Sequence, residues 1–313
     1  MSLVFIGMPV YNGEKYIKNA LDSLLCQTFT NWELLISDNA SEDDTAAICK
    51  RYCNNDKRIK YVRQRTNIGL SNFIYLLENS ESEYFMWAAA DDEWDSSFIE
   101  ACLQGLELSE DIGLAFTNIV NIDSFGRIIR EYPSFKKYSY SDRQLSITNF
   151  VLDPECLGKA NLIYGIYKIK KLKAFLIDFL SSQESNYYAS DVALNLGVLC
   201  RAGLSIDERV LFRKRYVRPS DSEISINYLK IPITPILSSM EVDKFQLYKK
   251  AVLAASSGTE YEKLVYTLME YREKLIEEIY VYDSYVSIRK QLKSMLKTVL
   301  PNSLINFIKK QRR

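Results

Sequence analysis

The chain has 313 residues, which is long enough for one large domain or two modest ones with a sizeable core. Its 40 basic and 40 acidic side chains balance, so no overall electric field favours nucleic acid or another polyanion as a partner. Histidine is absent, which excludes imidazole acid–base chemistry and nearly all catalytic zinc sites, and leaves proton transfer to carboxylates, Lys, Tyr or Cys.

The cysteines and the apolar segments indicate a cytoplasmic protein. None of the six cysteines forms a C-x-x-C pair, and the helical spacing of Cys49 and Cys53 indicates packing rather than chemistry. A reducing setting fits this pattern best. No basic signal-like segment starts the chain, and no apolar run approaches the ~20 residues that span a bilayer. We therefore expect neither secretion through a visible signal nor integral membrane insertion.

Apolar strand patterns alternate with helical patterns over roughly the first 90 residues. This alternation predicts an α/β fold with a doubly wound, mostly parallel sheet flanked by helices. The predicted strands are 3–10, 32–37, 58–63 and 84–90, and the predicted helices are 17–25, 42–54 and 69–80.

The alternation is less regular in the middle of the chain, where a hairpin-like piece interrupts it. Helices are predicted at 97–108, 170–180 and 190–201, and strands at 113–122, 128–132, 161–167 and 204–217. The polar, breaker-rich segment 218–223 is predicted to be a loop.

A glycine-poor helical region follows residue 228, where we place a boundary between domains 1–228 and 229–313. A helical pattern runs from Tyr261 towards Leu300, and its apolar stripe must pack either on the domain or on a second copy in a homodimer. Residues 289–313 hold eight basic side chains and no acidic one. Two interpretations stay open: an amphipathic helix on an anionic inner-membrane surface near a lipid-linked acceptor, or a helix packed on the domain with solvated charges.

Three acids, Asp91-Asp92-Glu93, follow the fourth predicted strand. Ligands bind in open α/β sheets outside the carboxyl ends of the strands, and adjacent carboxylates there suit a hard divalent cation. The simpler alternative is that Asp91 starts a turn and the acids up to Asp95 cap the next helix, with Glu93 as its first acid.

Polar side chains also end the first two strands, at Asn12 and at Asp38-Asn39. In a doubly wound sheet these strand ends line the same crevice as the three acids. The sequence contains neither G-x-x-x-x-G-K-[ST] nor G-x-G-x-x-G, so a phosphate loop and a dinucleotide fingerprint are both missing. Such a crevice needs a metal ion to hold a diphosphate.

Five short motifs stand in order along the first third of the chain. They are Met8-Pro9-Val10-Tyr11-Asn12-Gly13, Leu24-Leu25-Cys26-Gln27-Thr28-Phe29, Glu33-Leu34-Leu35-Ile36-Ser37-Asp38-Asn39-Ala40-Ser41, Asn67-Ile68-Gly69 and Asp91-Asp92. As an ordered set they resemble the family 2 glycosyltransferases, which are inverting enzymes with the GT-A nucleotide-sugar fold. The resemblance is strong over about 120 residues, thins towards residue 220, and implies a nucleotide-sugar half at 1–120 and an acceptor-side half at 121–228.

The resemblance implies a role for each matching residue on the donor side. Pro9, Tyr11 and Asn12 match the loop around the base and ribose, and the motif holding Asn67 belongs to the same nucleotide-sugar side. Asp38 matches the acid that hydrogen-bonds the base, with a plain strand-end turn as the alternative.

The acidic pair and one arginine belong to the diphosphate side of the expected site. Asp91 and Asp92 match the pair that holds the ribose and the Mg²⁺ or Mn²⁺ ion that bridges the diphosphate. Arg65 lies near the third strand end, where it meets either a phosphate or solvent.

Transfer to an acceptor hydroxyl requires a general base, which the family supplies from a Glu-Asp pair. Ser190-Asp191 stands at the corresponding place, so Asp191 is the candidate. The alternative is an acid favoured by the helix dipole at the start of a helix.

Two departures from the family pattern weaken the expected metal site. Ala89 fills the first acidic position of the Asp-x-Asp-Asp form found in many relatives, and Tyr216-Val217-Arg218-Pro219 lacks the histidine of a later motif. A metal-dependent inverting transferase that uses a nucleotide-diphosphate sugar, with UDP-sugars favoured, is still the function expected, in polysaccharide or lipopolysaccharide assembly. The alternatives are an inactive sugar-nucleotide-binding or scaffolding relative, and a sugar nucleotidyltransferase.

Overall fold

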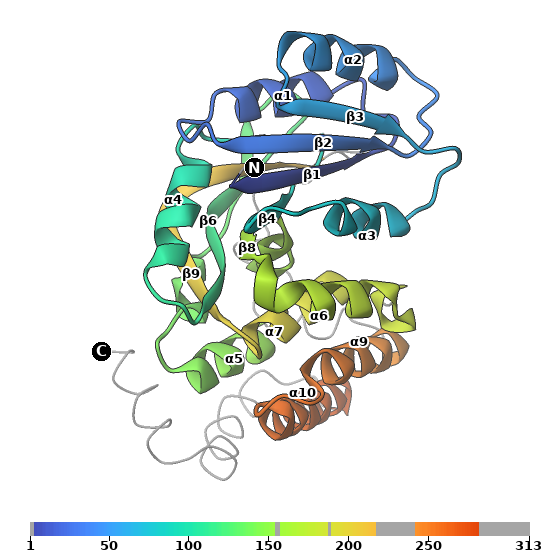
Figure 1. Ribbon diagram of the computed structural model, residues 1–313. Helices are drawn as coiled ribbons and strands as arrows, with labels where there is room; N and C mark the ends of the chain where they lie inside the picture. Colours follow the sequence, from blue (N-terminus) through green and yellow to red (C-terminus); the bar gives the residue numbers. More distant parts are fainter. Residues whose placement is uncertain (1–2, 154–156, 187–188, 217–241, 282–313) are drawn as a thin grey trace.

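The computed structural model describes residues 3–153, 157–186, 189–216 and 242–281. One mixed sheet runs through the molecule in the strand order β3-β2-β1-β4-β8-β6-β9-β5, and β7 pairs with β6 (Figure 1). The strands are β1 Val4–Val10, β2 Trp32–Asp38, β3 Ile59–Arg63, β4 Tyr84–Trp87, β5 Glu93–Trp94, β6 Ile112–Ile122, β7 Ile128–Glu131, β8 Ile166–Lys168 and β9 Gly203–Arg215.

Helices pack against this sheet, and some of them lie beyond it at one end of the molecule (Figure 1). The α-helices are α1 Ile17–Leu25, α2 Thr45–Asn55, α3 Ser71–Glu78, α4 Phe98–Glu107, α5 Arg143–Leu152, α6 Ile169–Ser181, α7 Ser190–Leu199, α9 Val242–Ser256 and α10 Glu262–Val281. The 3₁₀ helices are η1 Phe135–Tyr138, η3 Lys159–Tyr164 and η4 Gln183–Asn186.

The strand β1 is the centre of the first half because it pairs in parallel with β2 on one side and β4 on the other. Six of its seven residues are buried, as expected for a parallel strand covered on both faces. Gly7 allows α3 to approach closely, since a Cβ at this position would lie 2.9 Å from the Cβ of Leu76. The chain order reverses between β1 and β4, which makes their carboxyl ends the switch point of the sheet.

The predicted alternation is confirmed over the first 90 residues, where α1 has the expected bounds and the four strands lie within a few residues of their predicted places. The predicted strand 161–167 is wrong. Its first part forms the 3₁₀ helix η3, and only Ile166–Lys168 pairs, antiparallel to β4 and β6. The expected role of Glu93 as the first acid of a helix is also wrong. Glu93 lies in β5 opposite Arg213, and α4 begins only at Phe98.

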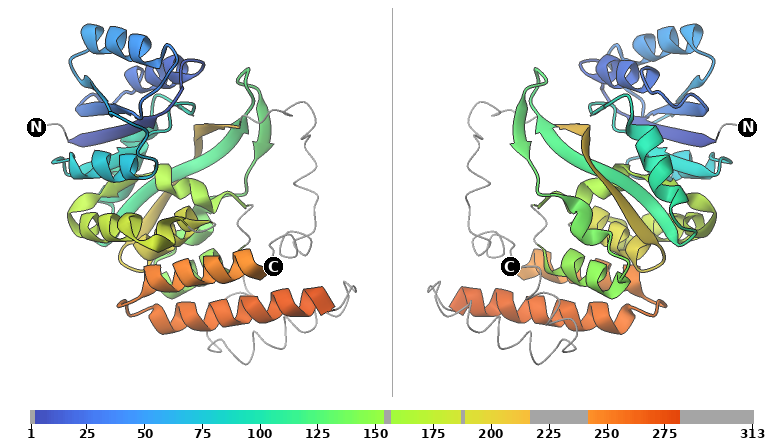
Figure 2. Two further views of the ribbon diagram at one scale, coloured as in Figure 1. Left: turned by 90° about the vertical axis from the view of Figure 1, so that its right-hand side faces the viewer. Right: turned by 90° about the vertical axis from the view of Figure 1, so that its left-hand side faces the viewer.

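The helices α9 and α10 pack against α7 and α5, at the end of the molecule far from β3 (Figures 1 and 2). In α9, Phe245, Tyr248 and Val252 belong to the same buried cluster as the strands. Arg272 of α10 is 1% exposed and donates to the carbonyl of Val151 in α5 at 3.0 Å. The long helix expected from Tyr261 is present as far as Val281.

Several predictions fall on residues outside the described ranges. These are the domain boundary near residue 228, the loop 218–223, the helix beyond Val281, and the membrane-surface contact assigned to 289–313. The homodimer contact expected of the C-terminal helices stays a prediction. Within the ranges that are described, no helix combines the length and apolar character needed to cross a membrane.

Candidate active site

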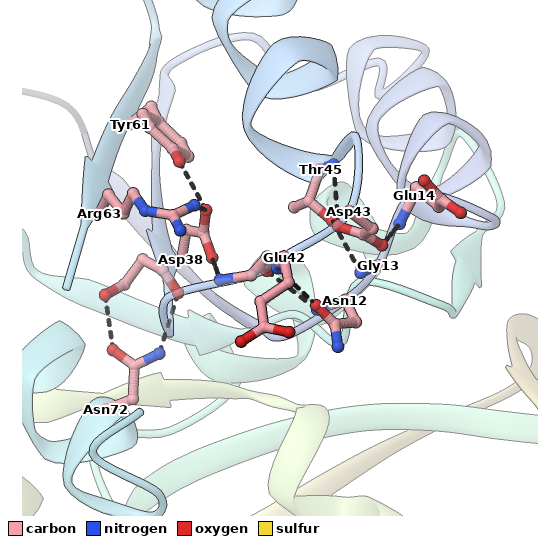
Figure 3. Close-up of polar contacts among 12 residues, drawn as sticks. Asn12, Gly13, Glu14, Asp38, Glu42, Asp43, Thr45, Tyr61, Arg63 and Asn72 are labelled. Atoms are coloured by element: carbon pink, nitrogen blue, oxygen red, sulfur yellow. Dashed lines mark hydrogen bonds and ion pairs between the residues drawn. The ribbon is translucent and has the colours of Figure 1, made fainter. Parts of the chain in front are cut away.

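The loops after β1 and β2 are fastened to each other by hydrogen bonds between backbone and side chains (Figure 3). The Asn12 N–H donates to Ser41 Oγ at 2.9 Å, and the Glu42 N–H donates to Asn12 Oδ1 at 2.8 Å. The Gly13 N–H donates to Thr45 Oγ1 at 2.8 Å. These hydrogen bonds join the two strand ends into one continuous rim.

In the described part of the chain, three non-glycine residues adopt left-handed backbone conformations, and each is a predicted site residue or lies two residues from one. Asn12 has φ 51° and Ala40 has φ 65°, and both residues lie in the two loops joined by these hydrogen bonds. Ala189, at φ 55°, immediately precedes the helix that carries Asp191. Such conformations are costly for residues with a Cβ and concentrate at functional sites, so they support a site at these loops.

Asp38 ends β2 with a fully buried carboxylate. Its Oδ1 accepts the Ser41 N–H at 2.7 Å, while its Oδ2 accepts the Tyr61 hydroxyl at 2.6 Å and the Arg63 guanidinium at 3.1 Å (Figure 3). Burial, followed by the bond to this carboxylate, raises the pKa of Tyr61 and keeps it a donor. Asp38 thus fixes the loop between β2 and α2, and its predicted bond to a base stays a prediction.

A cavity of about 370 Å³ opens at the carboxyl ends of β1, β2 and β4. This size is within the usual range for small-ligand sites. Among the residues predicted for the donor, four line it, namely Pro9, Tyr11, Asn12 and Asp91. The remaining lining comes from Val10, Gly13, Tyr16, Asn39, Gly69, Asn72, Phe73, Ala89, Ala90 and Tyr164.

The loop before α3 closes one side of this cavity through an amide pair. Asn39 donates from Nδ2 to Asn67 Oδ1 at 2.7 Å and accepts the Ile68 N–H at 2.7 Å. The Gly69 N–H also donates to Asn67 Oδ1, at 2.9 Å. Asn67 therefore shapes the pocket through Asn39 and Gly69, both of which line it. Arg65 is exposed and is not part of the lining.

The acidic pair after β4 is divided between two environments. Asp91 lines the cavity, whereas Asp92 is fully buried. Asp92 accepts the Arg215 N–H at 2.8 Å on Oδ1 and faces Lys214 Nζ at 3.4 Å on Oδ2. Burial raises the pKa of Asp92 to about 7, while Lys214 and the Arg215 N–H act to lower it.

The residues 5–160 match the family model for glycosyl transferase family 2. An uncharacterized glycosyltransferase of Rickettsia typhi is 28% identical over 229 residues, which is 73% of this chain and 68% of that protein.

The chain belongs to glycosyl transferase family 2.

Solved structures with the GT-A fold agree with this assignment. The S. aureus TarS fragment 1–349 is 16% identical and matches 95% of this chain and 79% of that chain with a TM-score of 0.61. The same fragment in complex with UDP-GlcNAc matches 97% and 83% at 15% identity with a TM-score of 0.59. The mannosyltransferase PcManGT from Pyrobaculum calidifontis, in complex with GDP-Man and Mn²⁺, is 13% identical and matches 98% and 83% with a TM-score of 0.52.

In this glycosyltransferase the end of β9 holds in place the turn formed by Asp91, Asp92 and Glu93, the acidic turn. Arg215 is 4% exposed and donates from Nε to the Asp91 carbonyl at 3.0 Å and from Nη1 to the Asp123 carbonyl at 2.6 Å. Its Nη2 pairs with Glu93, and its guanidinium lies 4.7 Å from the ring centroid of Tyr16. The short pairing of β5 with β9 brings these groups together.

The candidate base Asp191 occupies the second position of α7 and accepts the Val192 N–H at 2.8 Å. Its negative charge contributes to raising the pKa of Tyr164, a residue of the cavity lining. Lys214 acts to lower the pKa of Tyr164, but burial and the charges of Asp92, Asp91 and Asp191 raise it overall. Asp191 is not part of the cavity lining, and its role as the base stays a prediction.

Among the described residues that line the cavity, Asp91 is the carboxylate that could hold a metal ion. No group of three His, Cys, Asp or Glu side chains suitable for a metal occurs in the described ranges. Ala89 lines the cavity with a methyl group where many relatives carry a carboxylate. Mg²⁺ is commonly held by one or two carboxylates together with substrate phosphates, so a single pocket carboxylate fits an ion that arrives with a diphosphate.

Lys214 and Arg215 are the site residues that the sequence interpretation missed. Both lie inside the predicted strand 204–217, so the only signal was a pair of cations near the end of a strand joining the same sheet. Tyr16 and Tyr164, which line the pocket, carried no signal because single tyrosines are common in cores.

Proposed function

We propose that the chain moves a sugar from a nucleotide-diphosphate sugar, with a UDP-sugar favoured, to an acceptor hydroxyl with inversion. The observation that carries the proposal is the cavity at the switch point of the sheet, lined by Asp91 and by the β1 loop. The UDP-GlcNAc complex of TarS supports a UDP-sugar, since that fold neighbour binds one.

In the proposed donor complex, the loop with Pro9, Tyr11 and Asn12 surrounds the base and ribose. Asp38, predicted to hydrogen-bond the base, has a buried carboxylate and instead supports this loop through Ser41, which bonds Asn12. Asp91 would hold a Mg²⁺ or Mn²⁺ ion, which would supply Lewis-acid stabilisation to the leaving diphosphate. PcManGT, solved with GDP-Man and Mn²⁺, supports a divalent ion. Asp92 acts from behind by anchoring the turn that presents Asp91, because its own carboxylate is buried.

Asp191 is the proposed general base. It takes the proton of the acceptor hydroxyl at a carboxylate oxygen while the hydroxyl attacks the anomeric carbon from the face opposite the diphosphate. A positioned base of this kind contributes roughly 10²–10⁴-fold to the rate. The family resemblance supports an acceptor hydroxyl in cell-surface polysaccharide or lipopolysaccharide assembly, such as that of a lipid-linked glycan.

One specific observation favours a second candidate, an inactive relative that binds sugar nucleotides. Ala89 leaves only one carboxylate in the pocket lining, so the donor would bind without efficient transfer. A nucleotidyltransferase has no such support, because the loop Tyr11-Asn12-Gly13-Glu14 lacks the cations that hold a triphosphate.

The test is a screen of nucleotide sugars for release of nucleoside diphosphate, with Mn²⁺ and with a chelator. We expect at least one donor to be hydrolysed in a metal-stimulated reaction. Asp191→Asn is expected to retain donor binding and to lose transfer to an added acceptor by about 10²-fold or more. Donor binding without any turnover would favour the inactive relative, and no binding of any donor would contradict the proposed function.

A further inference from the structure

The ammonium group of Lys214 lies beside the donor pocket with hydrogen-bonding capacity to spare. Its Nζ is 3.4 Å from Asp92 Oδ2 and 4.5 Å from the ring centroid of Tyr164, which lines the cavity. Among the described residues, the Asp92 contact is its one side-chain hydrogen bond, and a lysine ammonium has three donors. The side chain is 26% exposed, whereas that of Asp92 is 0% exposed, so the lysine faces the open side of this pair.

The charge of this lysine is well supported by its surroundings. Burial acts to lower the pKa of Lys214, but Tyr164, Asp92 and Asp91 outweigh burial and raise it. The amine is therefore protonated at neutral pH. The neighbouring cation, Arg215, is committed to Glu93 and to two backbone carbonyls. Of these two described cations, Lys214, whose Nζ lies against the lining residue Tyr164, is therefore the one able to meet a ligand at the acidic turn.

The charges around the acidic turn also favour a contact between Lys214 and an anionic ligand. Glu93 is neutralised by Arg215 and Asp92 by Lys214, so Asp91 is the carboxylate that faces the pocket. A diphosphate beside one carboxylate would gain from a second positive charge besides a metal ion. Charge-assisted bonds from lysine to phosphate are among the stronger hydrogen bonds in proteins.

We propose that Lys214 binds the diphosphate of the nucleotide donor directly, so that this glycosyltransferase retains part of its nucleotide affinity without a divalent ion. The inference rests on the proposed function, because it takes the cavity as the nucleoside diphosphate site. Lys214 is then a donor-binding residue, with Asp92 as the group that orients its side chain.

The alternative role for Lys214 is to neutralise Asp92 and nothing more, and a double-mutant cycle separates the two roles. Nucleoside diphosphate binding is measured by calorimetry for wild type, Lys214→Met, Asp92→Asn and the double variant, with Mn²⁺ and with EDTA. The ligand is whichever of UDP, GDP, CDP and dTDP binds wild type most tightly. The double variant leaves no buried unpaired charge, so it keeps the test valid if Lys214→Met alone unfolds.

The proposal predicts measurable wild-type binding in EDTA that Lys214→Met weakens by about tenfold or more. It also predicts that the double variant binds as weakly as Lys214→Met, because the contact to phosphate is lost in both. The matched control is Lys60→Met, which removes an exposed lysine of β3 that pairs with Glu33 of β2. This variant should bind the nucleoside diphosphate as wild type does.

Two results would overturn the inference while leaving the proposed function intact. One is wild-type binding that disappears completely in EDTA, and the other is wild-type affinity in the double variant. Failure of all four nucleoside diphosphates to bind wild type with Mn²⁺ would instead contradict the proposed function, and the inference with it.

Discussion

The pocket has a buried aspartate on each side, Asp38 at the end of β2 and Asp92 after β4. The two aspartates are held by different parts of the chain. Asp38 is bonded by Ser41, Tyr61 and Arg63, all within 25 residues of it. Asp92 is bonded by Lys214 and by the Arg215 N–H, 122 and 123 residues away. One side of the pocket is therefore built by a local motif, and the other depends on a distant strand being correctly placed.

The largest effect is expected at the distant contact, from Arg215→Met. The substitution leaves two carbonyls and Glu93 without their buried cation, and breaking a buried ion pair costs about 3–5 kcal/mol of unfolding free energy. Urea denaturation followed by circular dichroism measures this loss. The control is Arg209→Met on the same strand, whose exposed pair with Asp207 should contribute less than about 1 kcal/mol. Equal losses in the two variants would show that Arg215 does not anchor the turn.

A smaller effect is expected at the local contact, from Asp38→Asn. The amide keeps one acceptor but loses the charge-assisted bonds from Tyr61 and Arg63, for a loss of about 1.5–3 kcal/mol in the same denaturation experiment. Arg63 is partly exposed and can turn to water, which is why this loss is smaller than at Arg215. A loss as large as that of Arg215→Met would remove the distinction between the two sides.

Asp92 should also make the stability of the protein depend on pH, and Asp92→Asn tests this. The folded pKa of Asp92, about 7, lies above its unfolded value of 3.8, so the folded chain binds this proton more tightly. Its contribution to stability is complete below about pH 4 and is lost as pH rises towards 7. Wild type should therefore lose at least about 1 kcal/mol relative to Asp92→Asn across this interval. Parallel stability profiles for the two proteins would contradict the raised pKa.

The smallest effect is expected from Tyr61→Phe, which removes one donor to Asp38 and leaves the other two. Since the carboxylate keeps its bonds from Ser41 and Arg63, the loss should be about 1.5 kcal/mol, at the lower end for a hydrogen bond to a charged group, and thermal unfolding should shift only slightly. The shift should vanish in an Asp38→Ala background, where the acceptor is absent. A persistent shift there would mean that the Tyr61 hydroxyl stabilises β3 through a partner other than Asp38.

The difference between the two sides also explains how far the sequence could predict this site. Near Asp38, apolar runs and polar strand ends lie close together in the chain, and β1, β2 and α1 were predicted nearly as found. Near Asp92, the structure depends on β5, whose two residues were predicted to belong to a helix start, and on the register of β9. A two-residue strand has no periodicity, and register between distant strands has no local signal.

The same reasoning accounts for the errors around η3 and Asp92. The apolar segment with Asn161, Ile163 and Tyr164 has the composition of a strand, but tertiary packing turns it into a 3₁₀ helix that brings Tyr164 to the pocket. Asp91 and Asp92 are adjacent in the sequence, so a shared role was expected for both. Consecutive side chains after a strand point in different directions, and only Asp91 lines the cavity.

This division of the acidic pair is the central claim, and nucleotide affinity in Mn²⁺ tests it most directly. Nucleoside diphosphate binding is compared by calorimetry between Asp91→Asn and Asp92→Asn, with wild type as reference. The account predicts that Asp91→Asn loses about tenfold or more in affinity at unchanged stability, whereas Asp92→Asn stays within about threefold of wild type. Unchanged affinity in Asp91→Asn together with a large loss in Asp92→Asn would contradict it.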